Sequence, residues 1–157
     1  MKKAVSLWSL GIGLSAALFL WAAPSLATLG GSVDSIESDR IMLSAAQGAV
    51  TPQSGYTVYE MTSSASTLRE YLSASGVVFA LAWNGLVRPD LTSLLGPYAA
   101  EYRVALRNTP RRPGMRNMSV VRAAGVVVET WGHVRSMHGR AYAPDLIPQG
   151  VSLDEVR

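Results

Sequence analysis

A chain of 157 residues that is 48% hydrophobic and lacks cysteine is expected to fold as one domain around one core, without disulfides or thiol catalysis. Its formal net charge is only +3, and Lys2 and Lys3 supply two of these charges, so the charge balance excludes an electrostatic argument for a nucleic-acid partner. Every fixed positive charge after Lys3 is an arginine, which excludes Schiff-base lysines and Ser–Lys dyads from the rest of the chain.

The first 27 residues have the three-part pattern of a secretory signal peptide. Lys2 and Lys3 precede an apolar run over residues 4–23, and Ser25 and Ala27 stand where signal peptidase requires small residues. A retained membrane anchor is the alternative, because the run is nearly long enough to span a bilayer. We expect cleavage after Ala27, a periplasmic or secreted domain over residues 28–157, and membrane contact only through the uncleaved signal segment.

The first element predicted in the exported part is a helix that begins at Val33 and ends near Gly48. Ser32 is a candidate N-cap, and acidic residues in the first turn match the helix dipole. The side expected to face the core carries Val33, Ile36, the stem of Arg40 and Leu43.

Three strands are predicted next, over Tyr56–Met61, Thr67–Ser73 and Val77–Trp83, and the short gaps between them suit hairpins. Alternation along the third strand gives it two apolar faces. One face would carry Val77, Phe79, Leu81 and Trp83, and the other Val78, Ala80 and Ala82. A strand of this kind is expected in the middle of a sheet that is covered on both sides.

A turn at Asn84-Gly85 and a central helix follow. Asp90 is placed to cap a helix that starts at Leu91. Its core-facing stripe is expected to contain Leu91, Leu94, Leu95, Tyr98 and Tyr102. Gly96-Pro97 must kink or split this helix, because proline has no backbone N–H to donate.

The last part of the chain predicts a loop over residues 108–117, strands over Val126–Trp131 and His133–Tyr142 with a bend at Gly132, and an irregular tail. Together the elements predict a single α+β domain. In it, an antiparallel sheet of about five strands packs against an N-terminal helix and a kinked central helix.

Seven segments of the expected domain form a recognisable set. They are Ala27–Gly31, Arg69–Tyr71, Gly76–Trp83, Arg88–Leu91, Leu94–Tyr98, Gly132–Arg135 and Gly139–Tyr142. These segments resemble an exported proteobacterial family known as domain-of-unknown-function family 2844, with departures at Ala99, Val134 and Met137. The resemblance covers nearly the whole mature chain. It implies a bacterial exported protein and, because the family has no established site, it implies no chemistry.

The densest group of candidate binding residues lies between Trp131 and Arg140. If this segment is one extended strand, His133 and Arg135 share one face, and His138 and Arg140 share the other. These arginines could bind an anion or a peptide carboxylate with the histidines as donors. The alternative, which we favour, is that they pair with acids of the same domain, such as Glu70 or Glu129.

Neither a metal nor a cofactor is expected, because the two histidines are the only ones in the chain and a zinc site would need several carboxylates to converge on them. Arg88 and Asp90 complete the candidate binding residues, although helix capping also explains Asp90. Aromatic side chains that could stack on a sugar are Trp83, Tyr98, Tyr102 and Trp131, but their positions on apolar faces favour core packing.

A second candidate surface is basic. Its centre is Arg111, Arg112 and Arg116, in a segment without acids between Glu101 and Glu129. Such a patch would suit phosphate-bearing envelope polymers or anionic lipid headgroups. A solvated loop is the alternative, and the neighbouring prolines and glycine favour it.

Export, small size and missing catalytic motifs predict a non-enzymatic binding module. The sequence contains no Gly-x-Ser-x-Gly, no P-loop and no His-Glu-x-x-His motif. The expected partner is another exported protein or an anionic envelope component. The alternative is a small periplasmic hydrolase in which His133 or His138 works with a carboxylate from Asp90, Asp145 or Glu129.

Overall fold

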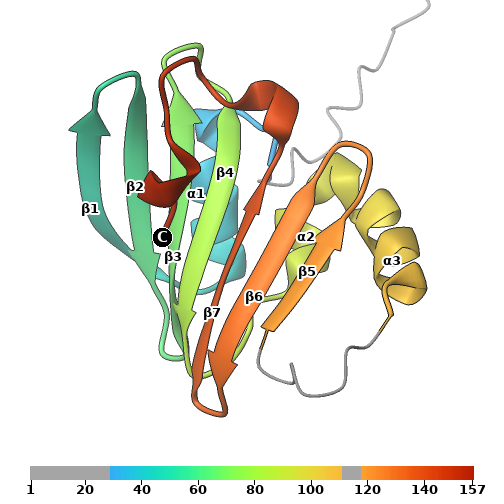
Figure 1. The fold of residues 1–157 in the computed structure, drawn as a ribbon. Coiled ribbons are helices and arrows are strands. Elements are labelled where there is room, and N and C mark those ends of the chain that lie inside the picture. Colours follow the sequence, from blue (N-terminus) through green and yellow to red (C-terminus); the bar gives the residue numbers. More distant parts are fainter. Residues whose placement is uncertain (1–28, 111–117) are drawn as a thin grey trace, which may run out of the picture.

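The structure, a computed structural model, describes residues 29–110 and 118–157 (Figure 1). Residues 1–28, with the predicted signal peptide, lie outside the described residues, and so do residues 111–117, with Arg111, Arg112 and Arg116. In the described part of the chain, no helix is both long and apolar enough to cross a membrane.

The described residues form an α+β fold around one antiparallel sheet in the order β1-β2-β3-β4-β7-β6-β5 (Figure 1). The strands are β1 Ala46–Gln53, β2 Tyr56–Thr62, β3 Ser66–Ser73, β4 Val78–Gly85, β5 Met118–Arg122, β6 Val127–His133 and β7 Ser136–Tyr142. The α+β class is confirmed, whereas the sheet has seven strands rather than about five.

The two additional strands are the edges of the sheet. β1 begins where the N-terminal helix was expected to continue, since α1 spans only Val33–Met42, so the predicted helix end near Gly48 is wrong. All eight residues of β1 are exposed, and β5 is only five residues long. Neither strand therefore has the alternation that reveals a strand in a sequence.

The central helix is split at Gly96-Pro97, as predicted. Its parts are α2 (Leu91–Leu94), the 3-10 turn η1 (Gly96–Tyr98) and α3 (Ala99–Asn108). Asp90 caps α2 by accepting a hydrogen bond from the Thr92 N–H at 2.9 Å. The predicted turn at Asn84-Gly85 is wrong, because both residues pair with β3 and β7 as the end of β4.

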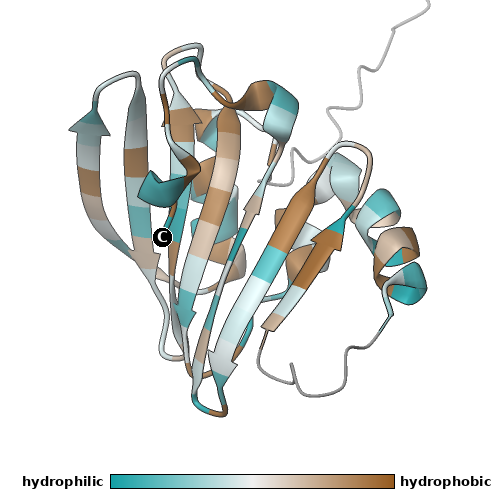
Figure 2. Cartoon of the chain, in the orientation of Figure 1, coloured by the Kyte–Doolittle hydropathy of each residue, from teal (hydrophilic) through white to brown (hydrophobic). Residues whose placement is uncertain are grey.

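The sheet is covered on both faces. On the face that we call the helix face, Leu68, Leu81, Trp83 and Val128 pack with Ile36 of α1, Leu94 of α2 and Tyr102 of α3. On the face that we call the tail face, Tyr56, Tyr71, Phe79 and Tyr142 pack with Leu153 and Val156 of the C-terminal tail. Figure 2 shows that the central strand β4 is hydrophobic along most of its length.

The position of β4 in the middle of the covered sheet is confirmed, and so is the alternation of faces from Ala80 to Trp83, but the predicted faces of Val78 and Phe79 are wrong. Leu72 of β3 pairs with Val78, and the preceding Tyr71 pairs with Ala80, so Phe79 is an extra residue in a bulge. The bulge puts Phe79 on the tail face together with Ala80, and it leaves Val78 on the helix face.

Hydrogen bonds hold the tail against the sheet. The tail contains the 3-10 turns η2 (Pro144–Leu146) and η3 (Leu153–Glu155). Arg140 donates to the Leu153 carbonyl at 2.6 Å, and the Tyr71 hydroxyl donates to the Arg157 carbonyl at 2.9 Å. The tail therefore acts as the cover of one core cluster.

Replacing Val156 by alanine tests this role of the tail. Val156 is 1% exposed in the cluster around Phe79, so V156A is expected to lower the free energy of unfolding by about 2 kcal/mol. Urea denaturation followed by circular dichroism measures the change. The matched control is Q149A at an exposed tail position, and equal stabilities of the two variants would contradict the role.

Candidate functional site

The tail leaves one end of the tail face open. Strand pairing places six side chains in a row across the sheet, which we call the end row: Thr62, Thr67, Asn84, His138, Trp131 and Met118. Side-chain hydrogen bonds to the tail come from Tyr56, Arg69, Tyr71 and Arg140, and all four residues lie in rows farther from this end.

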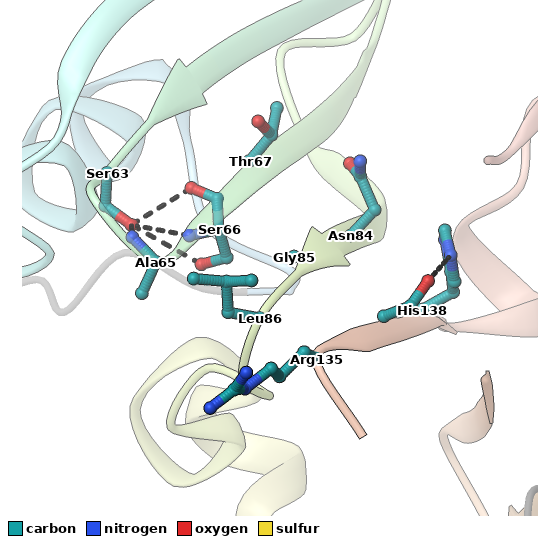
Figure 3. A pocket seen from close by; sticks show the side chains of 10 residues that line it. Ser63, Ala65, Ser66, Thr67, Asn84, Gly85, Leu86, Arg135 and His138 are labelled. Atoms are coloured by element: carbon teal, nitrogen blue, oxygen red, sulfur yellow. Dashed lines mark hydrogen bonds between the residues drawn. The ribbon is translucent and has the colours of Figure 1, made fainter. Parts of the chain in front are cut away.

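An open hollow of about 300 Å³ lies at the end row (Figure 3). Three segments line it. Ser63, Ala65, Ser66 and Thr67 come from the β2–β3 turn and the start of β3, Asn84, Gly85 and Leu86 come from the end of β4, and Arg135, Ser136 and His138 come from the β6–β7 hairpin. This lining contains hydroxyls, one amide, one imidazole and one guanidinium group, and none of these residues is an acid.

The β2–β3 side of the hollow is held in a fixed shape. The Ser63 hydroxyl donates to the Ser66 carbonyl at 3.0 Å and accepts from the Ser66 N–H at 3.1 Å (Figure 3). The Leu86 N–H donates to the Ala65 carbonyl at 2.8 Å, which ties the end of β4 to the same turn. The hydroxyl groups of this wall are thus positioned before any ligand arrives.

His138 and Asn84 present polar groups from the middle of the end row. The His138 ring is stacked with Trp131 at 6.1 Å between centroids and 7° between planes, and its Nε2 lies 3.4 Å from the Ser136 hydroxyl. The Asn84 Oδ1 is buried and has no hydrogen-bond partner among the described residues. The Asn84 amide lines the hollow beside His138 of the neighbouring strand.

Arg135 adds the positive charge of the hollow. It stands in the two-residue turn between His133 and Ser136, with a φ of 66°. Beside it, Val134 is 91% exposed. Figure 3 shows the Arg135 side chain below Leu86, on the opposite side of the hollow from Ser63.

The comparison with protein families assigns the chain to one of them. Residues 25–156 match the model of a protein of unknown function, DUF2844. The chain belongs to this family. Comparisons with curated proteins and with solved structures found no match for this DUF2844 protein.

The fold of the DUF2844 protein separates the candidate residues of the sequence analysis. The β6–β7 turn interrupts the segment that was expected to be one strand, so the expected sharing of a face by His133 and Arg135 is wrong. Arg135 and His138 meet at the hollow. His133 is exposed at the end of β6, and Arg88 is exposed between β4 and α2.

Arg140 has a structural role. It donates to the Glu129 carboxylate at 2.8 Å, and the side chains of the pair are 20% and 16% exposed. The favoured pairing of Arg140 with an acid of the same domain is therefore confirmed for Glu129. Glu70 is not this partner, because it is completely buried on the helix face.

The four aromatic candidates lie in different environments. Trp83 and Tyr102 lie in the core, as expected, and Tyr98 is half-buried against it. Trp131 is half-buried on the tail face beside His138. It also borders a second open hollow of about 490 Å³, which is lined by the Glu129–Arg140 ion pair and by Asp154, Val156 and Arg157 of the tail.

The residues that the sequence did not reveal are Thr67, Asn84, Ser66 and Ser136. They come from three segments that are distant in sequence, and only the pairing of β3, β4 and β7 brings these segments together. For metal ions, residues 29–110 and 118–157 contain no group of three or more His, Asp or Glu side chains that could hold one.

A buried carboxyl pair lies under α1, away from the hollow. Asp39 of α1 and Glu70 of β3 are 1% and 0% exposed. Burial raises the pKa of Glu70 to about 9 and that of Asp39 to about 6, and the negative charge of the neighbouring Asp39 adds to the rise at Glu70. The pair therefore holds one proton near neutral pH.

Proposed function

We propose that residues 28–157 form an exported, non-enzymatic binding module and that the end row with its hollow is the binding surface. The observation that carries this proposal is the lining of the hollow, in which the described residues combine neutral hydrogen-bonding groups with Arg135 and include no acid. A surface of this composition suits a polar ligand that carries negative charge. The expected partner is therefore an anionic envelope component of the periplasm or cell exterior.

The rigidity of the hollow supports binding. The Ser63 turn and the Leu86–Ala65 hydrogen bond fix its wall, so little conformational entropy is lost when a ligand binds. Asn84, which pairs with Thr67 and His138 of the neighbouring strands, adds an amide group to this fixed lining.

The hydrolase alternative receives less support. The 3.4 Å approach of Ser136 to His138 resembles a nucleophile beside a base, but such a base is normally oriented by a third group. Glu129 is engaged by Arg140, and Asp90 is engaged by α2. Asp145 lies exposed in η2.

Capture of ligands from envelope extract by the immobilised 28–157 domain tests the proposal. N84A removes an end-row group, and it is expected to reduce specific retention about five-fold, the effect of one lost hydrogen bond. The matched control is Q53A, which removes an exposed amide on β1 at the other edge of the sheet. Proteins are identified by mass spectrometry and glycans by sugar analysis. Equal retention by folded N84A and wild-type protein would overturn the proposed surface.

A further inference from the structure

The turn that carries Arg135 is not the most stable one that the backbone would allow. An L-residue with a φ of 66° costs about 1 kcal/mol relative to an ordinary conformation, and glycine adopts this region without that cost. The preceding Val134 is 91% exposed, so this tip gains no apolar burial in return. Strain of this kind, at a residue that lines a hollow, points to a role for the side chain itself.

The guanidinium group of Arg135 is available for a ligand. Among the described residues, Arg40 forms an ion pair with Glu37, Arg69 with Glu60 and Arg140 with Glu129. In this same part of the chain, Arg135 has no ion-pair partner, and it faces a hollow without acids. A planar guanidinium of this kind binds a carboxylate through two parallel hydrogen bonds.

The rest of the hollow suits a molecule with many hydroxyl groups. Thr67, Ser66 and Ser136 carry hydroxyls that can both donate and accept, and Asn84 contributes an amide. Leu86, at 54% exposure, gives the lining a small apolar contact rather than a deep pocket for a peptide side chain. Sugars match this chemistry because their hydroxyls also donate and accept, while their C–H groups pack on small apolar surfaces.

We propose that the hollow binds an acidic carbohydrate of the uronate type, with Arg135 binding the carboxylate and Asn84 and Thr67 binding neighbouring hydroxyls. This inference rests on the proposed function and deepens it, since it names the ligand class of the same surface. The strained turn is then explained by function: it holds a guanidinium group at the hollow that also contains the hydroxyl-bearing residues.

Calorimetric titration of the 28–157 domain with a soluble oligogalacturonate, and with its neutral methyl ester, tests the inference. Wild-type protein is expected to bind the acid at least about ten-fold more tightly than the ester, the effect of a charge-assisted bidentate contact. R135G is expected to remove this preference without loss of stability, because glycine relieves the strained φ. R135K keeps the charge without the planar fork, and its preference should be intermediate. The control Q53A should bind both ligands like wild type.

The outcomes separate this inference from the proposed function. Equal binding of acid and ester, or an acid preference that survives in R135G, would overturn the role of Arg135. If neither saccharide binds while the N84A-sensitive capture from envelope extract persists, the uronate ligand is wrong and the binding surface stands. Binding of inorganic phosphate in place of the uronate, lost in R135G, would also reject the carbohydrate and indicate a phosphate-bearing ligand.

Discussion

The free energy of unfolding is expected to fall by about 3 kcal/mol or more as the pH rises from about 5 to about 9, because Asp39 and Glu70 are buried together. Both carboxyl groups have a raised pKa in the folded protein, to about 6 for Asp39 and about 9 for Glu70. Between its unfolded and folded pKa values, each group holds a proton that the unfolded chain has released. Folding therefore takes up protons in this range, and stability is lost as the pH increases.

The groups that surround Asp39 and Glu70 do not neutralise these carboxyls, so the two buried acids are the source of the pH dependence. Tyr59 of β2 and Leu81 of β4 are the strand partners of Glu70, and neither side chain carries a positive charge. On α1, the neighbouring Arg40 is bound to Glu37 at 2.6 Å on the exposed side. No described cation thus pairs with the buried carboxyls, and deprotonation leaves buried negative charge.

Replacing Glu70 by glutamine is the decisive variant. The amide has the shape of the acid, stays neutral, and can donate to Asp39, so E70Q should flatten the pH profile and exceed wild-type stability near pH 9. Urea denaturation at a series of pH values measures both effects. The control is E37Q, which neutralises an exposed acid of α1 and should keep the wild-type slope. If the stability of the wild-type protein did not change with pH, the raised pKa values of Asp39 and Glu70 would be contradicted.

The same pair explains why α1 was only partly predictable. Helical spacing predicts that Val33 and Leu43 lie on the core side. Leu43 does pack against the core, but Val33 is 45% exposed, and the buried residues of α1 are Ser35, Ile36 and Asp39. From the sequence alone, an acidic residue is predicted to lie on the surface, even when it occupies a core position. Its partner Glu70 lies in a different element, so the sequence carries no local sign of the pairing.

The strands that can be predicted from the sequence are those with buried apolar residues. β2, β3 and β4 have alternating or continuous apolar residues and were found, whereas β1 has none buried and was missed. The bulge at Phe79 was hidden because both faces of β4 are apolar, so one inserted residue leaves the pattern unchanged. At the candidate site, Arg135 and His138 were identified by residue type, but the end row depends on the register of six strands.

Gly139 to alanine is expected to destabilise the fold strongly. Gly139 of β7 pairs with Trp83 of β4, and the indole lies over the glycine. A Cβ at this position would lie 2.2 Å from Trp83 Cζ2 and 2.8 Å from the Glu129 carbonyl oxygen. Trp83 is 2% exposed and has no free space to enter, so G139A should lower stability by about 3 kcal/mol.

A double-mutant cycle with W83F separates the indole clash from a general effect of alanine in β7. Phenylalanine shortens the side chain, so G139A should cost about 1 kcal/mol less in the W83F background than in wild type. Urea denaturation of the four proteins gives the coupling directly. Equal costs in both backgrounds would place the clash at the Glu129 carbonyl instead. A wild-type stability for G139A would show that β4 and β7 can separate at this row, next to Asn84 and His138, and the hollow could then not be as rigid as its hydrogen bonds indicate.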